Sequence, residues 1–103
     1  MKAEELVKKI EETFGEDSLF DFMEGYVETE EFLKDNDIVF IGDFNEDISD
    51  SYGWSDMILK RVYKHTPTGN HFMVTGTDAS YAGTEWNEIK DVKPIGKKIK
   101  YYE

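Results

Sequence analysis

Residues 57–75 read MILKRVYKH, TPTGN and HFMVT, and they give the clearest indication of the fold. The segment TPTGN, residues 66–70, is a strong turn signal, because proline presets a turn backbone and glycine and asparagine tolerate a left-handed one. The β-branched and aromatic residues on each side are typical of strands. Residues 57–65 also suit a helix, since Ile58 and Val62 are four positions apart, but the turn favours a strand. The stretch therefore predicts an antiparallel hairpin.

Three short helices are expected before this hairpin. In the first, apolar residues recur at three- and four-residue steps, as on one face of an amphipathic helix, and Gly15 stands where a C-terminal cap is expected. These apolar residues are Leu6, Val7, Ile10 and Phe14. A second helix is expected after a cap at Asp17 or Ser18 and ends near Gly25. A third is expected over residues 29–34.

The remaining segments predict two further strands and one long loop. Residues 38–44 are short, β-branched and aromatic, as in a strand. Residues 45–55 are polar and are expected to form a loop. Residues 93–102 predict a final strand, and Pro94 suits a start at a sheet edge.

The fold class expected from this order is α+β. Helices over residues 1–36 would pack on one antiparallel sheet of about four strands over residues 37–103. A chain of 103 residues supports one core and hence a single domain. Its 15% aromatic content is more than disordered chains offer, which favours a folded protein.

The net charge of −11 is unevenly distributed. Residues 1–56 hold 18 acidic residues against four lysines, a balance of −14, whereas residues 57–103 hold five against eight, a balance of +3. This asymmetry points to recognition of a basic surface on another protein, or to one well-solvated acidic face. Direct binding of nucleic acid is not expected, because phosphates would be repelled.

The composition also limits the chemistry and the compartment. The absence of cysteine excludes disulfides and thiolate sites. The longest purely apolar run, residues 38–41, is far below a membrane span, and the N-terminus lacks an apolar core of signal-peptide length. We therefore expect a cytoplasmic protein with no membrane partner.

No motif predicts an enzyme, a cofactor or a strong metal site. Residues 43–49 place oxygen ligands at alternate positions, as a calcium loop does, but Ile48 stands where glycine is needed and Trp54 where a glutamate belongs. Weak binding of a divalent ion and a plain solvated loop stay open, and the second is favoured. His65 and His71 flank the turn, but two imidazoles make an incomplete site unless a carboxylate joins them. Ordinary surface histidines are therefore favoured.

Aromatic residues beside glycines offer a second kind of binding surface. Trp54, Tyr81 and Trp86 could anchor a protein interface, since tryptophan and tyrosine dominate interfacial binding energy. They could equally fold back to close the ends of the sheet, which is favoured because each ring buries a large area.

The acidic stretch over residues 16–56 is the strongest functional signal, with 14 acidic residues and only Lys34 opposing them. Carboxylates on a rigid surface can imitate the phosphates of a duplex and attract a protein groove built for nucleic acid. Ordinary solubility is the alternative, and composition alone favours it. The residues expected to bind a partner are Asp43, Glu46, Asp47, Asp50 and Asp56, followed by Glu28, Glu30 and Glu31.

The C-terminal part shows a resemblance. It contains FMVTG at 72–76, SYAGTEW at 80–86, DVKPI at 91–95 and KIKYYE at 98–103. This order resembles small acidic proteins of unknown function carried by phages and prophages, and it covers about a third of the chain. The resemblance implies a mobile-element context and a host-cell cytoplasm, and no active site. Such proteins include inhibitors of host restriction and CRISPR systems.

The leading hypothesis is therefore an accessory binding protein whose acidic face blocks a nucleic-acid-binding host protein. The alternative is a small interaction or immunity-type module that binds through the aromatic residues.

Overall fold

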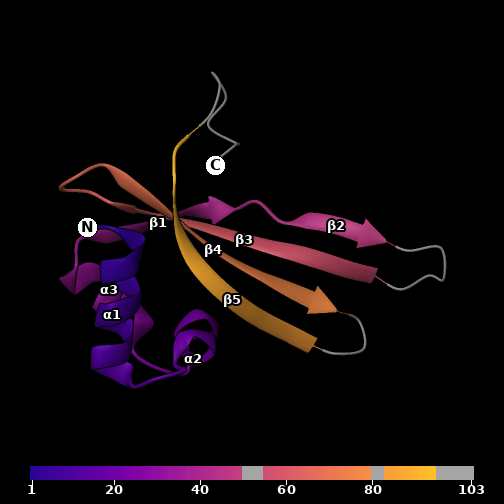
Figure 1. Cartoon of the computed structure of the whole chain (residues 1–103), viewed down its shortest axis with the longest axis horizontal. Coiled ribbons are helices and arrows are strands. Elements are labelled where there is room, and N and C mark those ends of the chain that lie inside the picture. Colours follow the sequence, from indigo (N-terminus) through magenta and orange to yellow (C-terminus); the bar gives the residue numbers. More distant parts are fainter. Residues whose placement is uncertain (50–54, 80–82, 95–103) are drawn as a thin grey trace.

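Strand β3 (Ser55–His65) pairs with strands on both of its sides and organises the sheet (Figure 1). The computed structural model describes residues 1–49, 55–79 and 83–94. The sheet order is β1-β3-β4-β5, all antiparallel, and β2 also pairs with β3. The other strands are β1 (Ile38–Asp43), β2 (Glu46–Ser49), β4 (Asn70–Ala79) and β5 (Gly83–Val92). With helices packed on this sheet, the predicted α+β class is confirmed.

The hairpin predicted from residues 57–75 is the β3–β4 pair. His65 lies opposite Asn70 and Tyr63 opposite Phe72. Gly69 adopts a φ of 74° in the turn and donates its N–H to the His65 carbonyl at 2.9 Å. Because opposite residues share a face, Tyr63 and Phe72 point to the same side of the sheet, where the helices lie.

The three helices are α1 (Ala3–Phe14), α2 (Leu19–Glu24) and α3 (Thr29–Asp35). Gly15 and Gly25 follow the first two with positive φ values, as predicted for helix ends. Ser18 stands at the start of α2, but its hydroxyl donates to the Gly15 carbonyl at 2.7 Å and caps no helical N–H. Ser18 is therefore the N-cap residue, one of the two predicted, but the turn before the helix takes up its hydroxyl.

The main core lies between the helices and one face of the sheet. Phe22 and Phe32 meet edge to face with centroids 5.4 Å apart, and Phe14 packs beside both rings. The helices cover only one end of the sheet, so the distal ends of β2 to β5 extend past them (Figure 1). A smaller cluster on the opposite face consists of Val62, Met73 and Val92, with Phe44 packed against it.

The polar loop predicted over residues 45–55 is wrong at both ends, since β2 covers Glu46–Ser49 and β3 begins at Ser55. The backbone of Lys60 bridges the interruption between β1 and β2. Its carbonyl accepts from the Phe44 N–H at 2.7 Å, and its N–H donates to the Asn45 side chain at 2.9 Å. The residues of β2 have little strand preference of their own, and they form a strand because they pair with the long β3.

The region after Thr75 continues the sheet. Gly76 lies inside β4 and Gly83 begins β5, although glycine is more typical of turns and loops. Gly76 faces Trp86 at a bulge, and a Cβ there would clash with the Glu85 carbonyl oxygen. Glycine therefore marks a close approach of two strands here. The final strand predicted over residues 93–102 falls almost entirely outside the described residues.

Candidate partner-binding surface

One segment of the helical layer is rich in exposed carboxylates. Between Lys9 and Lys34 the chain holds nine acidic residues and no lysine or arginine. All nine are exposed, whereas apolar residues of the same segment, such as Phe22, turn into the core. We call this set the acidic patch: Glu11, Glu12, Glu16, Asp17, Asp21, Glu24, Glu28, Glu30 and Glu31.

Like charges crowd most closely at α3. Glu31 is three residues after Glu28 and four before Asp35, and these spacings place side chains side by side on a helix. A hydrogen bond shared with Glu28, and repulsion by Glu28 and Asp35, raise the pKa of Glu31 above its ordinary 4.5. The predicted partner-binding residues Glu28, Glu30 and Glu31 thus come together at one helix, in a locally unfavourable arrangement.

The acidic residues predicted around the β1–β2 segment are more neutralised. Asp43 Oδ1 accepts from Arg61 Nε at 2.8 Å, and Glu46 Oε1 accepts from Lys60 Nζ at 2.8 Å. Ion pairing reduces the field that these two carboxylates offer a partner. Because the Asp43 carboxylate already binds Arg61, it is less suited to be a calcium ligand, and segment 43–49 resembles a calcium loop less.

The other residues predicted for this region are divided. Asp47 is exposed on β2. Asp56 is partly buried, and its Oδ1 has no hydrogen-bond partner among the described residues. Asp50 lies outside the described residues, as do Trp54 and Tyr81 of the predicted aromatic surface.

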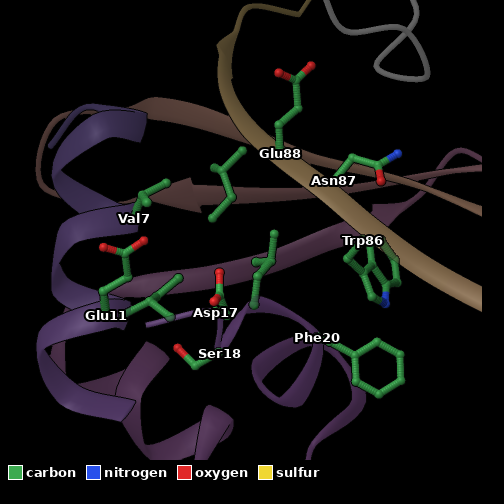
Figure 2. A pocket seen from close by; sticks show the side chains of 11 residues that line it. Val7, Glu11, Asp17, Ser18, Phe20, Trp86, Asn87 and Glu88 are labelled. Carbon is green, nitrogen blue, oxygen red and sulfur yellow. The ribbon is translucent and has the colours of Figure 1, made fainter. Parts of the chain in front are cut away.

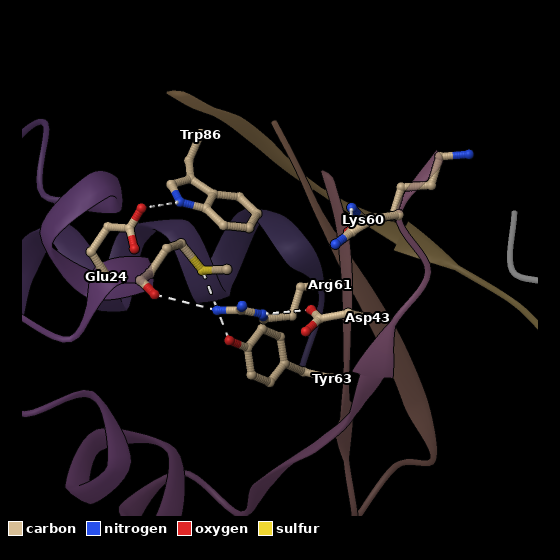
Figure 3. Close-up of polar contacts among 8 residues, drawn as sticks. Glu24, Asp43, Lys60, Arg61, Tyr63 and Trp86 are labelled. Atoms are coloured by element: carbon tan, nitrogen blue, oxygen red, sulfur yellow. Dashed lines mark hydrogen bonds and ion pairs between the residues drawn. The ribbon is translucent and has the colours of Figure 1, made fainter. Parts of the chain in front are cut away.

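Trp86 lies on β5 and is held by the fold. Its indole N–H donates to Glu24 Oε1 at 3.4 Å, and the Arg61 guanidinium carbon lies 5.3 Å from its ring centroid (Figure 3). The same guanidinium carbon lies 5.9 Å from the Phe40 ring. Burial lowers the pKa of Arg61, but its hydrogen bond to Asp43 and its other partners raise it overall, so the cation is stabilised.

Two exposed aromatic side chains beside α2 were not among the predicted site residues. Phe20 is 40% exposed and Tyr26 is 73% exposed, and their ring centroids lie 6.0 Å apart. Phe22 and Met23 of the same segment are buried. The helix predicted over this segment could have indicated that Phe20 is exposed. Phe20 cannot lie on the same helix face as both Phe22 and Met23, which are buried.

A cleft of about 470 Å³ opens between α1, α2 and β5. Figure 2 shows Val7 and Glu11 of α1 on one side and Phe20 and Trp86 on the other, with Asp17 and Ser18 between them. Further apolar lining comes from Ile10, Leu19 and Ile89. Among the described residues no lysine or arginine lines the cleft, so apolar walls and carboxylates together define its chemistry.

The histidines do not form a joint site. His65 pairs with Asn70 and His71 pairs with Lys64, so the two imidazoles point to opposite faces of the sheet. His65 Nδ1 lies 2.7 Å from Thr68 Oγ1. Burial and the nearby Lys64 lower the pKa of His71. Over residues 1–49, 55–79 and 83–94, no three metal-binding side chains gather in a suitable group.

Comparisons of the chain with family models, with curated proteins and with solved structures give no match in any of the three. None of the helices in the described ranges is long and apolar enough to cross a membrane.

Proposed function

We propose that this protein is a non-catalytic binding protein whose acidic patch occupies a basic, nucleic-acid-binding groove on another protein and blocks it. The observation that carries the proposal is the acidic patch itself: nine exposed carboxylates in the segment between Lys9 and Lys34, which itself holds no lysine or arginine. A groove that evolved to bind phosphates attracts such a surface for the same electrostatic reason.

The crowding at α3 favours a binding role over simple solubility. Solubility needs net charge dispersed over the surface. A hydrogen bond shared with Glu28, together with repulsion by Glu28 and Asp35, raises the pKa of Glu31, which means that the folded state disfavours its ionised form. Features that cost local stability are typical of functional surfaces. A cationic partner would relieve this repulsion on binding.

The mechanism is charge presentation. The buried Phe22 and Phe32 fix α2 and α3 against the core, so the carboxylates of the acidic patch are held before the partner arrives. Preorganisation lowers the entropy cost of association. Long-range attraction speeds the encounter, and this gain falls as salt rises. Glu28, Glu30 and Glu31 are the leading contact residues, with Asp47 next, because Asp43 and Glu46 are ion-paired.

The proposed setting is the cytoplasm of a bacterial host. The resemblance to small acidic phage proteins supports it, and inhibition of a restriction or CRISPR nuclease would fit a surface that imitates nucleic acid. The partner is then a protein with a basic groove, and nucleic acid competes with this protein for that groove.

A charge variant with a matched control tests the proposal. Glu28→Gln, Glu30→Gln and Glu31→Gln together remove three charges from the acidic patch. Glu4→Gln, Glu5→Gln and Glu85→Gln remove three exposed charges outside it. Tagged proteins would be incubated with bacterial lysate and washed at low and then high salt.

Wild type and the control should capture the same partner and release it in high salt. The acidic-patch variant should capture at least about tenfold less. Equal capture by the two variants would contradict the proposal.

A second candidate is a small interaction or immunity-type module that binds through aromatic side chains. The exposed pair Phe20 and Tyr26 favours it. Trp86 supports it less, because Arg61 and Glu24 already contact the indole. A complex of this kind would survive high salt, since buried apolar area is poorly screened.

A further inference from the structure

We propose that the cleft between α1, α2 and β5 binds a cationic amphipathic segment of the partner, which inserts an apolar side chain between the helices and the strand. This inference rests on the proposed function and names the part of the basic partner that makes the closest contact.

The cleft arises where β5 departs from regular pairing with β4. Thr75 lies opposite Glu88, and Gly76 lies opposite Trp86, so Asn87 is an extra residue in β5. A bulge of this kind bends its strand and increases the local twist. The bulge lies at the wall of the cleft, and the resulting volume of about 470 Å³ is within the range of ligand pockets.

The walls are suited to an aliphatic or aromatic side chain. Val7 and Leu19 are only partly buried, and both line the cleft. Phe20 and Trp86 flank its other side (Figure 2), and aromatic faces attract both apolar groups and cations. A partner side chain placed here would remove this apolar surface from water.

The charges around the cleft select a cation beside that side chain. Glu11 and Asp17 line the cleft, and both belong to the acidic patch. With no lysine or arginine in the lining, a carboxylate-bearing segment would meet only repulsion. A segment with apolar and basic residues can pack its apolar side chains against the walls and pair its cations with the carboxylates at the rim. An amphipathic helix binds an apolar groove in this way.

The test uses synthetic helical peptides as probes. One peptide carries leucine and lysine on opposite faces, and a second has the same number of lysines with the leucines replaced by glutamine. Binding is measured by titration with nuclear magnetic resonance. The Trp86 indole N–H signal is assigned by comparison with a Trp86→Phe variant.

The leucine-containing peptide should bind at least about tenfold more tightly than its polar counterpart. It should shift the Trp86 indole signal and the amides of α1 and α2 that line the cleft.

Three variants locate the site. Val7→Trp fills the cleft and should lower the affinity for the leucine-containing peptide at least about tenfold. Val39→Trp makes the same substitution on exposed β1, outside the cleft, and should leave binding unchanged. Asp17→Asn removes a rim charge while keeping a residue type that tolerates the φ of 56° at this position, and should weaken both peptides.

Equal binding of the two peptides, or an unmoved Trp86 signal in the wild-type protein, would overturn the cleft proposal. This wild-type measurement decides the matter even if Val7→Trp fails to fold. The proposed function would survive that result if capture from lysate still depended on Glu28, Glu30 and Glu31. Loss of that dependence with normal peptide binding would instead remove the proposed function.

Discussion

The Arg61 guanidinium carbon lies 5.3 Å from the centroid of the Trp86 ring, although the two residues belong to strands that are not neighbours in the sheet. Arg61 also donates to Asp43 on β1 and, at 3.3 Å, to the Met23 carbonyl of α2 (Figure 3). One side chain therefore connects three strands and a helix. It also explains why Asp43 is unavailable as a free carboxylate.

Replacing Arg61 should reveal this connecting role in the free energy of unfolding. Arg61→Ala should destabilise the protein by about 2 kcal/mol, between the values for exposed and buried ion pairs, because it also removes the ring contacts. Arg61→Lys should still lose more than half as much stability as Arg61→Ala, since the lysine ammonium lacks the planar guanidinium that makes these contacts. Urea unfolding measures both. Lys60→Ala breaks only the exposed pair with Glu46 and should cost about 0.5 kcal/mol or less. Equal losses at positions 60 and 61 would refute this role.

Glycine at position 76 should be indispensable to the β4–β5 pair. In Gly76→Ala the new Cβ would clash with the Glu85 carbonyl and lie 3.1 Å from the Trp86 Cα, so the strands must separate. We expect a loss of about 3 kcal/mol in the free energy of unfolding.

Gly42→Ala is the matched control. Its Cβ would meet only the Phe44 ring, at an ordinary 3.5 Å, and Gly42 has no positive φ. Thermal unfolding of both variants should show a large fall in Tm for position 76 and a small change for position 42. A Gly76→Ala protein as stable as the wild type would mean that β4 and β5 do not approach as described.

The repulsion at α3 predicts a pH-dependent gain in stability for Glu31→Gln. The folded state raises the pKa of Glu31, so ionisation at neutral pH lowers stability, and this loss disappears as the pH falls below the ordinary value of 4.5. Glu31→Gln should therefore have a higher Tm than the wild type at pH 7. The difference should vanish in acid below that value.

Glu28→Gln relieves the same repulsion and should raise the Tm in the same direction. Thermal unfolding across this pH range measures both effects. A Tm for Glu31→Gln at or below that of the wild type at pH 7 would mean that attraction to the N-terminus of α3 outweighs the repulsion. The crowding of carboxylates at α3 would then not favour a binding role over solubility.

Local sequence patterns were sufficient where local physics determines the structure. The turn at residues 66–70 and the glycines after α1 and α2 specify a hairpin and helix ends through backbone conformation alone. Strand β2 could not be predicted in this way, because its polar residues become a strand only by pairing with β3. The place of Gly76 inside β4 could not be predicted locally, because the residue that it contacts, Trp86, lies ten positions later.

The same distinction applies to the candidate site. Sequence alone located the acidic half of the chain, since charge can be counted. It could not show that Asp43 and Glu46 are paired by cations that follow them by 18 and 14 residues. The cleft was also beyond prediction, because it joins residues 7–20 to residues 86–89 and depends on the bulge at Asn87.

Competition with duplex DNA would show whether this protein occupies a nucleic-acid-binding groove. Proteins from a bacterial lysate would be bound to immobilised DNA and then eluted with rising amounts of this protein at constant salt. Wild type and the Glu4, Glu5 and Glu85 control should release the same DNA-binding protein. The variant with glutamine at positions 28, 30 and 31 should release at least about tenfold less. If the wild type displaced no protein from DNA, or if both variants displaced equal amounts, the acidic patch would not be a mimic of nucleic acid.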